Sequence, residues 1–173
     1  MRIVVLIKQI LDKSGVIVRR DKERIFINQE AYIISPGDKN GLEAALQIKD
    51  ADPENEVVVV SLGLPRVDDA LREALAMGAD RAYLLSDRLF EMCDLAGRAR
   101  ILAAAVVRIG ADLVVTGREA GDAAAGQIGP RVAEILNIAQ VSDVHVLEVQ
   151  DSAVTATRRC GQGYATVETS LQA

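Results

Sequence analysis

The arrangement of apolar residues along the chain alternates between continuous runs typical of buried strands and stripes with helical spacing. This alternation restricts the possible folds more than any other feature. Two continuous β-branched runs, Ile3 to Ile7 and Val57 to Ser61, are typical of strands that are covered on both faces. Weaker runs follow at Ala82 to Ser86 and at Asp112 to Thr116. Apolar stripes with helical spacing separate the runs. The stripes comprise Leu42, Ala45 and Leu46; Val67, Ala70, Leu71, Ala74 and Leu75; Leu95, Ala99, Leu102, Val106 and Ile109; and Ile128, Val132, Ile135 and Leu136. Strands and helices that alternate in this way predict an α/β fold with a doubly wound, mostly parallel sheet.

Residues between the periodic segments refine this outline. Gly78 and Gly110 end two helical stripes, because glycine accepts the positive φ that helix ends require. Asp38 is expected to cap the first long helix. The segment Val16 to Asn28 predicts a short hairpin around the charged turn Arg20 to Glu23. Near the C-terminus, alternating polar positions predict antiparallel strands at Val144 to Val149, Ala153 to Thr157 and Tyr164 to Thr169.

Length and composition exclude several classes of protein. A chain of 173 residues is expected to form a single domain, residues 1–173. Aromatic residues make up only 3% and the net charge is −5, which argues against a protein that binds nucleic acid or an anionic membrane. No stretch is apolar enough to span a bilayer, so no membrane insertion is expected. The two cysteines lack metal-ligand spacing, and a cytoplasmic location is the simplest interpretation.

The segments that follow the strands are the expected ligand-binding region. In an open parallel sheet, ligands bind beyond the carboxyl ends of the strands, where the strand order reverses. The relevant segments are Lys8-Gln9, Ser61 to Gly63 and Gly117 to Pro130, with Ser35 to Asp38 before the first long helix. The Gly117 to Pro130 segment is rich in glycine and alanine and leads into a helix, whose free N–H groups suit a phosphate. It therefore predicts a nucleotide site without a P-loop, and the alternative is a connector that only lets helix and sheet pack.

Side chains suited to catalysis are scarce. The one histidine, His145, lies in a predicted strand, and neither Cys93 nor Cys160 has a neighbouring base in the sequence. No serine, histidine and aspartate set can be assembled. The chemistry is therefore expected to belong to a bound cofactor rather than to side chains.

Four motifs together resemble the beta subunits of electron-transfer flavoproteins. They are Ile7-Lys8-Gln9 after the first strand, Ser35-Pro36-Gly37-Asp38 before the helix, the segment Arg72 to Ala82, and the loop Gly117 to Pro130. They occur in the family's order along the whole chain. The resemblance implies an adenine-nucleotide-binding, Rossmann-like domain that acts as an electron carrier subunit and not as an enzyme.

The resemblance also implies a cofactor and partners. A beta subunit of this family pairs with an alpha subunit that carries most of the redox FAD. It buries AMP or a second FAD itself, and the heterodimer passes electrons from flavin dehydrogenases to acceptors. The positions that match the family's nucleotide site are Leu6, Ser35, Pro36, Gly37, Asp38, Leu62, Gly117, Arg118, Glu119, Ala120, Gly121, Asp122, Ala123, Ala124, Ala125, Gly126, Gln127 and Ile128.

The sequence departs from the family pattern in three places. Where the family loop usually reads Asp-x-Asp-Thr-Gly-Gln, this chain has Ala124 and Ala125 in place of the second carboxylate and the hydroxyl. Ser35 replaces the usual asparagine before Pro36. The family continues for tens of residues beyond Ala173, so either a truncated chain or a C-terminally shortened member is expected, and docking to acyl-CoA dehydrogenases through that region is not carried over.

Two other interpretations of the same α/β pattern are available. One is a stand-alone adenine-nucleotide-binding module of the stress-sensor type, whose glycine pattern this chain lacks. The other is an ATP-pyrophosphatase of similar topology. It would need a Ser-Gly-Gly-x-Asp-Ser loop after a strand, and Ser61 to Pro65 does not supply one.

Overall fold

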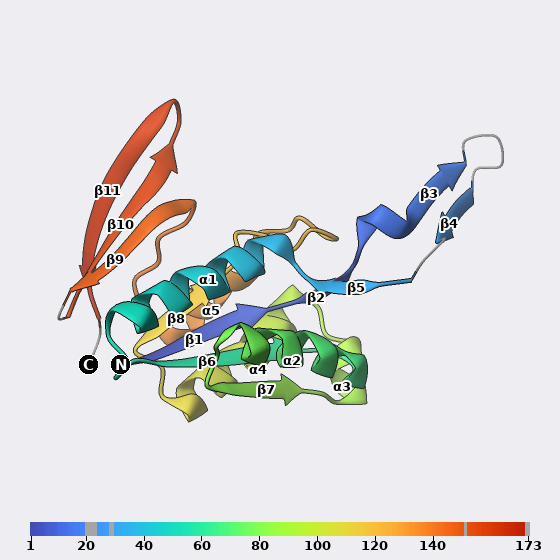
Figure 1. Ribbon diagram of the computed structural model, residues 1–173, viewed down its shortest axis with the longest axis horizontal. Coiled ribbons are helices and arrows are strands. Elements are labelled where there is room, and N and C mark those ends of the chain that lie inside the picture. The colour runs from blue at the N-terminus through green and yellow to red at the C-terminus, as the bar shows by residue number, and fades with distance from the viewer. Residues whose placement is uncertain (20–23, 28–29, 151, 172–173) are drawn as a thin grey trace.

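A four-stranded parallel sheet forms the centre of the protein in the computed structural model, which describes residues 1–19, 24–27, 30–150 and 152–171 (Figure 1). Its strands are β1 (Arg2–Ile7), β6 (Glu56–Leu62), β7 (Arg81–Leu85) and β8 (Leu113–Thr116). They lie in the order β7-β6-β1-β8. The chain moves outward from β1 through β6 to β7 and then returns to the other side of β1 as β8. The strand order therefore reverses between β1 and β8, which confirms the predicted doubly wound sheet.

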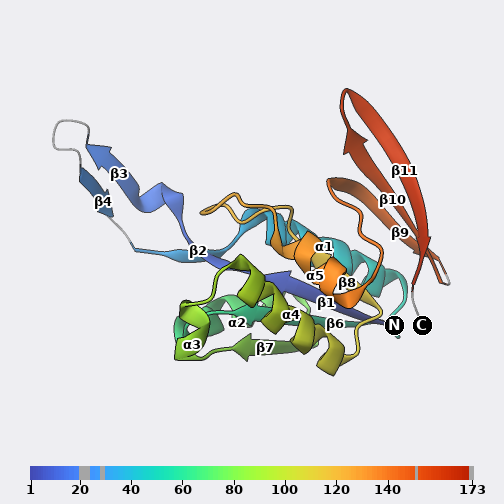
Figure 2. The same ribbon diagram turned by 180° about the vertical axis from the view of Figure 1, so that it is seen from behind.

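Helices cover both faces of this sheet, as seen from the two sides in Figures 1 and 2. On one face, α1 (Pro36–Ala51) and α2 (Asp68–Met77) pack against alternate strand residues that include Ile3, Val5, Val57 and Val59. On the other face, α4 (Leu95–Ile109) and α5 (Ile128–Leu136) pack against the intervening residues Val4, Leu6, Val58 and Val60. Because successive side chains of a strand point to opposite faces, both faces of β1 and β6 need apolar residues.

Two short antiparallel pairs follow β1. The strand β2 (Gln9–Leu11) pairs with β5 (Tyr32–Ile34), and β3 (Val16–Arg19) pairs with β4 (Arg24–Ile27) after a 3₁₀ turn, η1 (Lys13–Gly15). The β3–β4 pair projects away from the central sheet (Figure 1) and confirms the predicted hairpin. The predicted turn Arg20 to Glu23, and Asn28, lie outside the described residues.

The C-terminal part forms a separate antiparallel sheet in the order β11-β10-β9. Its strands are β9 (Val144–Gln150), β10 (Ala153–Cys160) and β11 (Gly163–Ser170). This sheet stands beside α1 in Figures 1 and 2, and its central strand buries Val154 and Ala156. The predicted antiparallel strands are therefore confirmed. Two further short elements, η3 (Pro65–Val67) and α3 (Arg88–Glu91), were not predicted because they are too short to show a period.

Several helix predictions need correction. The first long helix begins at Pro36 with Ser35 at its N-cap, so the expectation that Asp38 caps it is wrong. Proline favours the first helical position, and this places Asp38 inside the first turn. Leu75 and Ile135 fit their apolar stripes, yet 41% and 46% of their surfaces are exposed because they lie at the margins of the packed faces. Gly78 and Gly110 do end their helices, with φ of 125° and 76°.

None of the helices in the described part of the chain is both long and apolar enough to cross a membrane.

Candidate functional site

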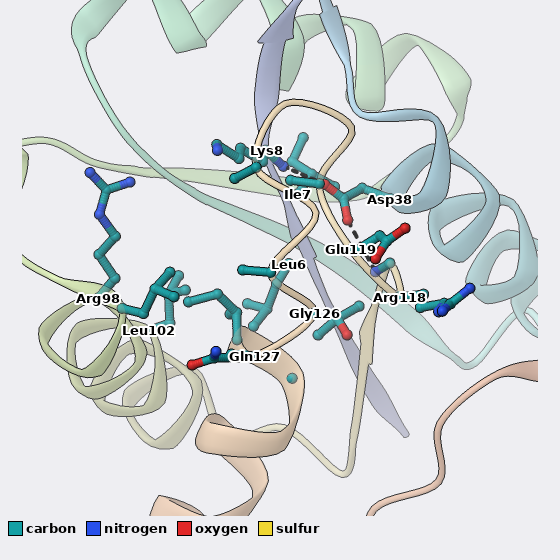
Figure 3. Close-up of a pocket in the computed structure, with 18 of the residues that line it drawn as sticks. Leu6, Ile7, Lys8, Asp38, Arg98, Leu102, Arg118, Glu119, Gly126 and Gln127 are labelled. Atoms are coloured by element: carbon teal, nitrogen blue, oxygen red, sulfur yellow. Dashed lines mark hydrogen bonds between the residues drawn. The ribbon is translucent and has the colours of Figure 1, made fainter.

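A cavity lies at the carboxyl edge of the central sheet, where the strand order reverses (Figure 3). Its walls come from the ends of β1, β6 and β8, from the first turn of α1, from α4 and from the loop between β8 and α5. Twelve residues that the resemblance implied line it: Leu6, Asp38, Leu62, Gly117, Arg118, Glu119, Ala120, Ala123, Ala125, Gly126, Gln127 and Ile128.

The other six implied residues lie next to the cavity without lining it. They are Ser35, Pro36, Gly37, Gly121, Asp122 and Ala124. Several of them hold the β8–α5 loop against the start of α1. The hydroxyl of Ser35 accepts a hydrogen bond from the backbone N–H of Gly121 at 3.3 Å. An ideal Cβ on Gly37 would lie 3.4 Å from the backbone oxygen of Glu119, which shows how closely the two segments pack.

Seven lining residues were not among the predicted binding residues: Ile7, Lys8, Leu95, Arg98, Leu102, Thr116 and Gly129. Lys8 belongs to a segment that was expected at this edge of the sheet. Leu95 and Arg98 come from the start of α4, which follows β7 in the chain. A crossover helix begins at the carboxyl edge of the sheet, so this rule could have identified both residues.

Two glycines let the backbone segments around the cavity approach closely. An added Cβ on Gly117 would lie 2.2 Å from Oδ1 of Asp38 and 2.7 Å from the backbone nitrogen of Asp38. An added Cβ on Gly129 would lie 2.8 Å from Oγ1 of Thr116. A larger residue at either position would displace one wall, so the geometry here requires glycine.

Asp38 joins the ends of the two strands that flank the reversal point. Its Oδ2 accepts the backbone N–H of Lys8 at 2.8 Å, and its Oδ1 accepts the N–H of Gly117 at 3.1 Å. Only 6% of its surface is exposed. Burial raises the pKa of the Asp38 carboxyl to about 6, although the hydrogen bonds from Lys8 and Gly117 act in the opposite direction.

A bidentate ion pair fastens the β8–α5 loop to the end of β1. The ammonium of Lys8 lies 2.8 Å from Oδ1 and 2.7 Å from Oδ2 of Asp122. Partial burial alone would raise the pKa of Asp122, but the hydrogen bond and charge of Lys8 lower it on balance. Because 37% of the Lys8 side chain and 44% of the Asp122 side chain are exposed, the pair holds the loop without adding much stability.

Replacing Asp122 by asparagine should therefore loosen the loop selectively. We expect the free energy of unfolding to fall by less than about 1 kcal/mol, because the pair is solvent-exposed. Hydrogen exchange of the backbone amides of residues 118–126 should accelerate several-fold. The matched control is Glu73→Gln, which breaks the similarly exposed Lys39–Glu73 pair on α1 and α2. Equal loop exchange in both variants would contradict a role for Lys8–Asp122 in holding the loop.

The start of α5 faces the cavity without a side-chain cap. Gln127 occupies the N-cap, but its side-chain oxygen accepts hydrogen bonds from the guanidinium of Arg131 at 3.1 and 2.9 Å. Ile128 and Gly129, the first residues of the helix, line the cavity. The uncapped N–H groups and the positive end of the helix dipole can hold an anionic group there.

The rest of the cavity supplies apolar surface and cationic side chains. Leu6, Leu62 and Leu102 present aliphatic side chains that can cover a planar ring. Arg98 also lines the cavity, and its Nε donates to the backbone oxygen of Cys93 at 3.1 Å. Arg118 pairs with Asp143, with Nε and Oδ1 3.0 Å apart. A cavity with an uncapped helix start at one end and apolar walls is suited to a nucleotide.

The histidine and the two cysteines are not among the residues that line this cavity. His145 is exposed on β9, and its ring meets the ring of Tyr164 edge-on with the centroids 5.3 Å apart. Cys93 and Cys160 are free thiols. Among the residues that the structure describes, no three His, Cys, Asp or Glu side chains gather in a way that could hold a metal ion.

Known proteins resemble this chain over nearly its whole length. Residues 24–173 match a family described as the electron transfer flavoprotein domain. A caffeyl-CoA reductase-Etf complex subunit of Acetobacterium woodii is 38% identical over 99% of this chain and 66% of its own length. An electron transfer flavoprotein subunit beta of Thermoanaerobacterium thermosaccharolyticum is 39% identical over 97% of the chain and 64% of its own length. Protein FixA of Sinorhizobium fredii is 35% identical over 99% of the chain and 62% of its own length. The chain thus spans just under two thirds of the length of these relatives.

Proposed function

The chain belongs to the electron transfer flavoprotein family as a beta-type member, and we propose that the cavity between the ends of β1 and β8 binds an adenine nucleotide, AMP or a second FAD. The observation that carries this proposal is the uncapped start of α5, which the glycine- and alanine-rich loop brings to the point where the strand order reverses.

The residues present fit such a nucleotide. Gly117 and Gly129 let the cavity wall pack against Asp38 and Thr116 with no Cβ between them, and Gly126 turns the loop with φ of 60°. The N–H groups at the start of α5 would hold a phosphate, and the side chains of Leu6 and Leu102 would cover the adenine. AMP would serve as a structural ligand, whereas FAD would add a flavin that accepts and donates electrons.

The nucleotide is tested on the purified chain in two steps. The protein is denatured, its supernatant is analysed by mass spectrometry, and the refolded or nucleotide-free protein is titrated with AMP and with FAD in a calorimeter. We expect AMP or FAD in the supernatant, or saturable binding of one of them. If neither nucleotide is released and neither binds, the proposal is wrong.

We further propose that the chain works in a heterodimer with an alpha-type subunit that carries the redox FAD, and that this complex passes electrons from flavin dehydrogenases to acceptors. The name of one relative, the caffeyl-CoA reductase-Etf complex subunit of Acetobacterium woodii, supports a role inside a larger assembly. The cavity supplies a nucleotide site, and within the described residues no catalytic side-chain set lines it. Electron transfer would therefore depend on bound flavin.

Co-expression tests this partnership. The chain and an alpha-type subunit from the same source are co-purified, and the product is examined by sizing chromatography and an absorbance scan. We expect a yellow complex of both chains with flavin bands. The matched control is the alpha-type subunit expressed alone. Failure of the two chains to co-elute at micromolar concentration would contradict the heterodimer.

A further inference from the structure

Asp38 places a buried carboxylate on the wall of the nucleotide cavity. It lies in the first turn of α1, and its two oxygens accept the N–H groups of Lys8 and Gly117, which directly follow β1 and β8. The carboxylate is therefore held in one orientation by both sides of the crevice (Figure 3). The carboxylate lies at the N-terminal, positive end of the α1 dipole, and its negative charge opposes the binding of an anionic ligand group at that helix end.

Among the described residues, no cationic side chain forms an ion pair with Asp38, although the charge of Lys8 acts on it from further away and lowers its pKa. The ammonium of Lys8 binds both oxygens of Asp122 instead. The other charged residues on the cavity wall that come from the facing loop are Glu119, which adds negative charge, and Arg118, which pairs with Asp143. The pKa of about 6 keeps Asp38 ionised at neutral pH. Asp38 thus places a negative charge on the α1 side of the cavity, while the remaining cation that lines it, Arg98, comes from α4.

The α5 side of the cavity has the opposite character. The helix begins there without a side-chain cap, and its first residues, Ile128 and Gly129, line the cavity. In Figure 3, Asp38 and Gln127 lie on opposite sides of Leu6. The cavity therefore has an end that attracts an anion and an end that repels one.

We propose that Asp38 sets the orientation and selectivity of the nucleotide: the 5′-phosphate binds at the start of α5, and the carboxylate accepts a hydrogen bond from a ribose hydroxyl. This inference rests on the proposed nucleotide function. A carboxylate that accepts from a ribose hydroxyl is incompatible with a phosphate in place of that hydroxyl, because two anions would then meet in a poorly hydrated site. Nucleotides with a second phosphate on the ribose are therefore rejected.

The test compares AMP with adenosine 2′,5′- and 3′,5′-bisphosphate by calorimetry at pH 7.5. We expect the wild-type protein to bind AMP at least about tenfold more tightly than one of the two bisphosphates. Asp38→Asn and Asp38→Ser should reduce that ratio several-fold, because each removes the charge. Glu43→Gln removes the same charge from an exposed position of α1 and should leave the ratio unchanged.

A second measurement needs no variant. If Asp38 accepts from a ribose hydroxyl, 2′-deoxy-AMP or 3′-deoxy-AMP should bind the wild-type protein several-fold more weakly than AMP. Equal binding of all the ribose-modified nucleotides would overturn the role of Asp38, as would an unchanged ratio in folded Asp38 variants. If AMP itself does not bind, the nucleotide function fails and this inference fails with it; if AMP binds without discrimination, only the inference fails.

Discussion

Replacement of Gly117 by alanine should lower the free energy of unfolding by about 3 kcal/mol or more, since it forces backbone apart rather than a flexible side chain. The new Cβ would lie 2.2 Å from Oδ1 of Asp38 and 2.7 Å from both the nitrogen of Asp38 and the carbonyl carbon of Gly37. Relief of this clash requires α1 to move away from the end of β8. That movement would break the hydrogen bond from Gly117 to Asp38 and open the cavity.

The effect of Gly117→Ala is measured by urea denaturation and by AMP titration. Gly163→Ala is the matched control, because an added Cβ there meets no atom within 4 Å. We expect the control to change stability by less than about 0.5 kcal/mol and to leave AMP binding intact. Equal stabilities of the two variants would show that α1 and β8 do not pack as closely as the structure indicates.

Asp38 should make the protein less stable as the pH rises from about 4 to about 7. Its pKa is 3.8 in an unfolded chain and about 6 in the folded protein, so the folded state holds the proton more tightly. The stability that this proton contributes is fully present below pH 3.8 and is lost as the pH rises through 6. A difference of about two pKa units corresponds to about 3 kcal/mol.

The contribution of Asp38 is isolated by comparing urea denaturation of the wild-type protein and Asp38→Asn at several pH values. Both oxygens of Asp38 accept a backbone N–H, from Lys8 and from Gly117. In the asparagine variant the amide NH₂ replaces one of these acceptors and faces a backbone N–H donor, so we expect the variant to be less stable than the wild-type protein at every pH. The difference in free energy of unfolding between the wild-type protein and Asp38→Asn should be largest near pH 4 and should decrease toward pH 7. Glu43→Gln should show no such trend. A deficit that grows with pH would mean that Asp38 has a lowered pKa and that burial is not the dominant influence.

The central sheet could be predicted from the sequence because its strand residues are compatible with few structures other than a strand buried on both faces. Continuous β-branched runs such as Val57 to Val60 are stable only where both faces are covered, and helical stripes of matching length lie between them. The antiparallel strands after α5 were equally visible from their alternating pattern. Short elements such as β2, β5 and α3 were missed, because three or four residues define no period.

The cavity was only partly predictable for a different reason. The loop Gly117 to Ile128 stood out by composition, and most of its residues do line the cavity. Leu102 and Arg98 belong to an ordinary amphipathic helix, and only the three-dimensional arrangement brings them to the site. Asp38 resembles a helix cap in the sequence, whereas its partners are 30 and 79 residues away. Contacts over such distances leave no local pattern in a single sequence.

Hydrogen exchange with and without saturating AMP reports directly where the nucleotide binds on the protein. We expect bound AMP to slow exchange in the backbone amides of residues 117–129, at the start of α5 and at Lys8, with no change in the β9–β11 sheet. Saturable AMP binding that leaves the 117–129 amides unchanged, or that protects only the β9–β11 sheet, would contradict a nucleotide site between the ends of β1 and β8.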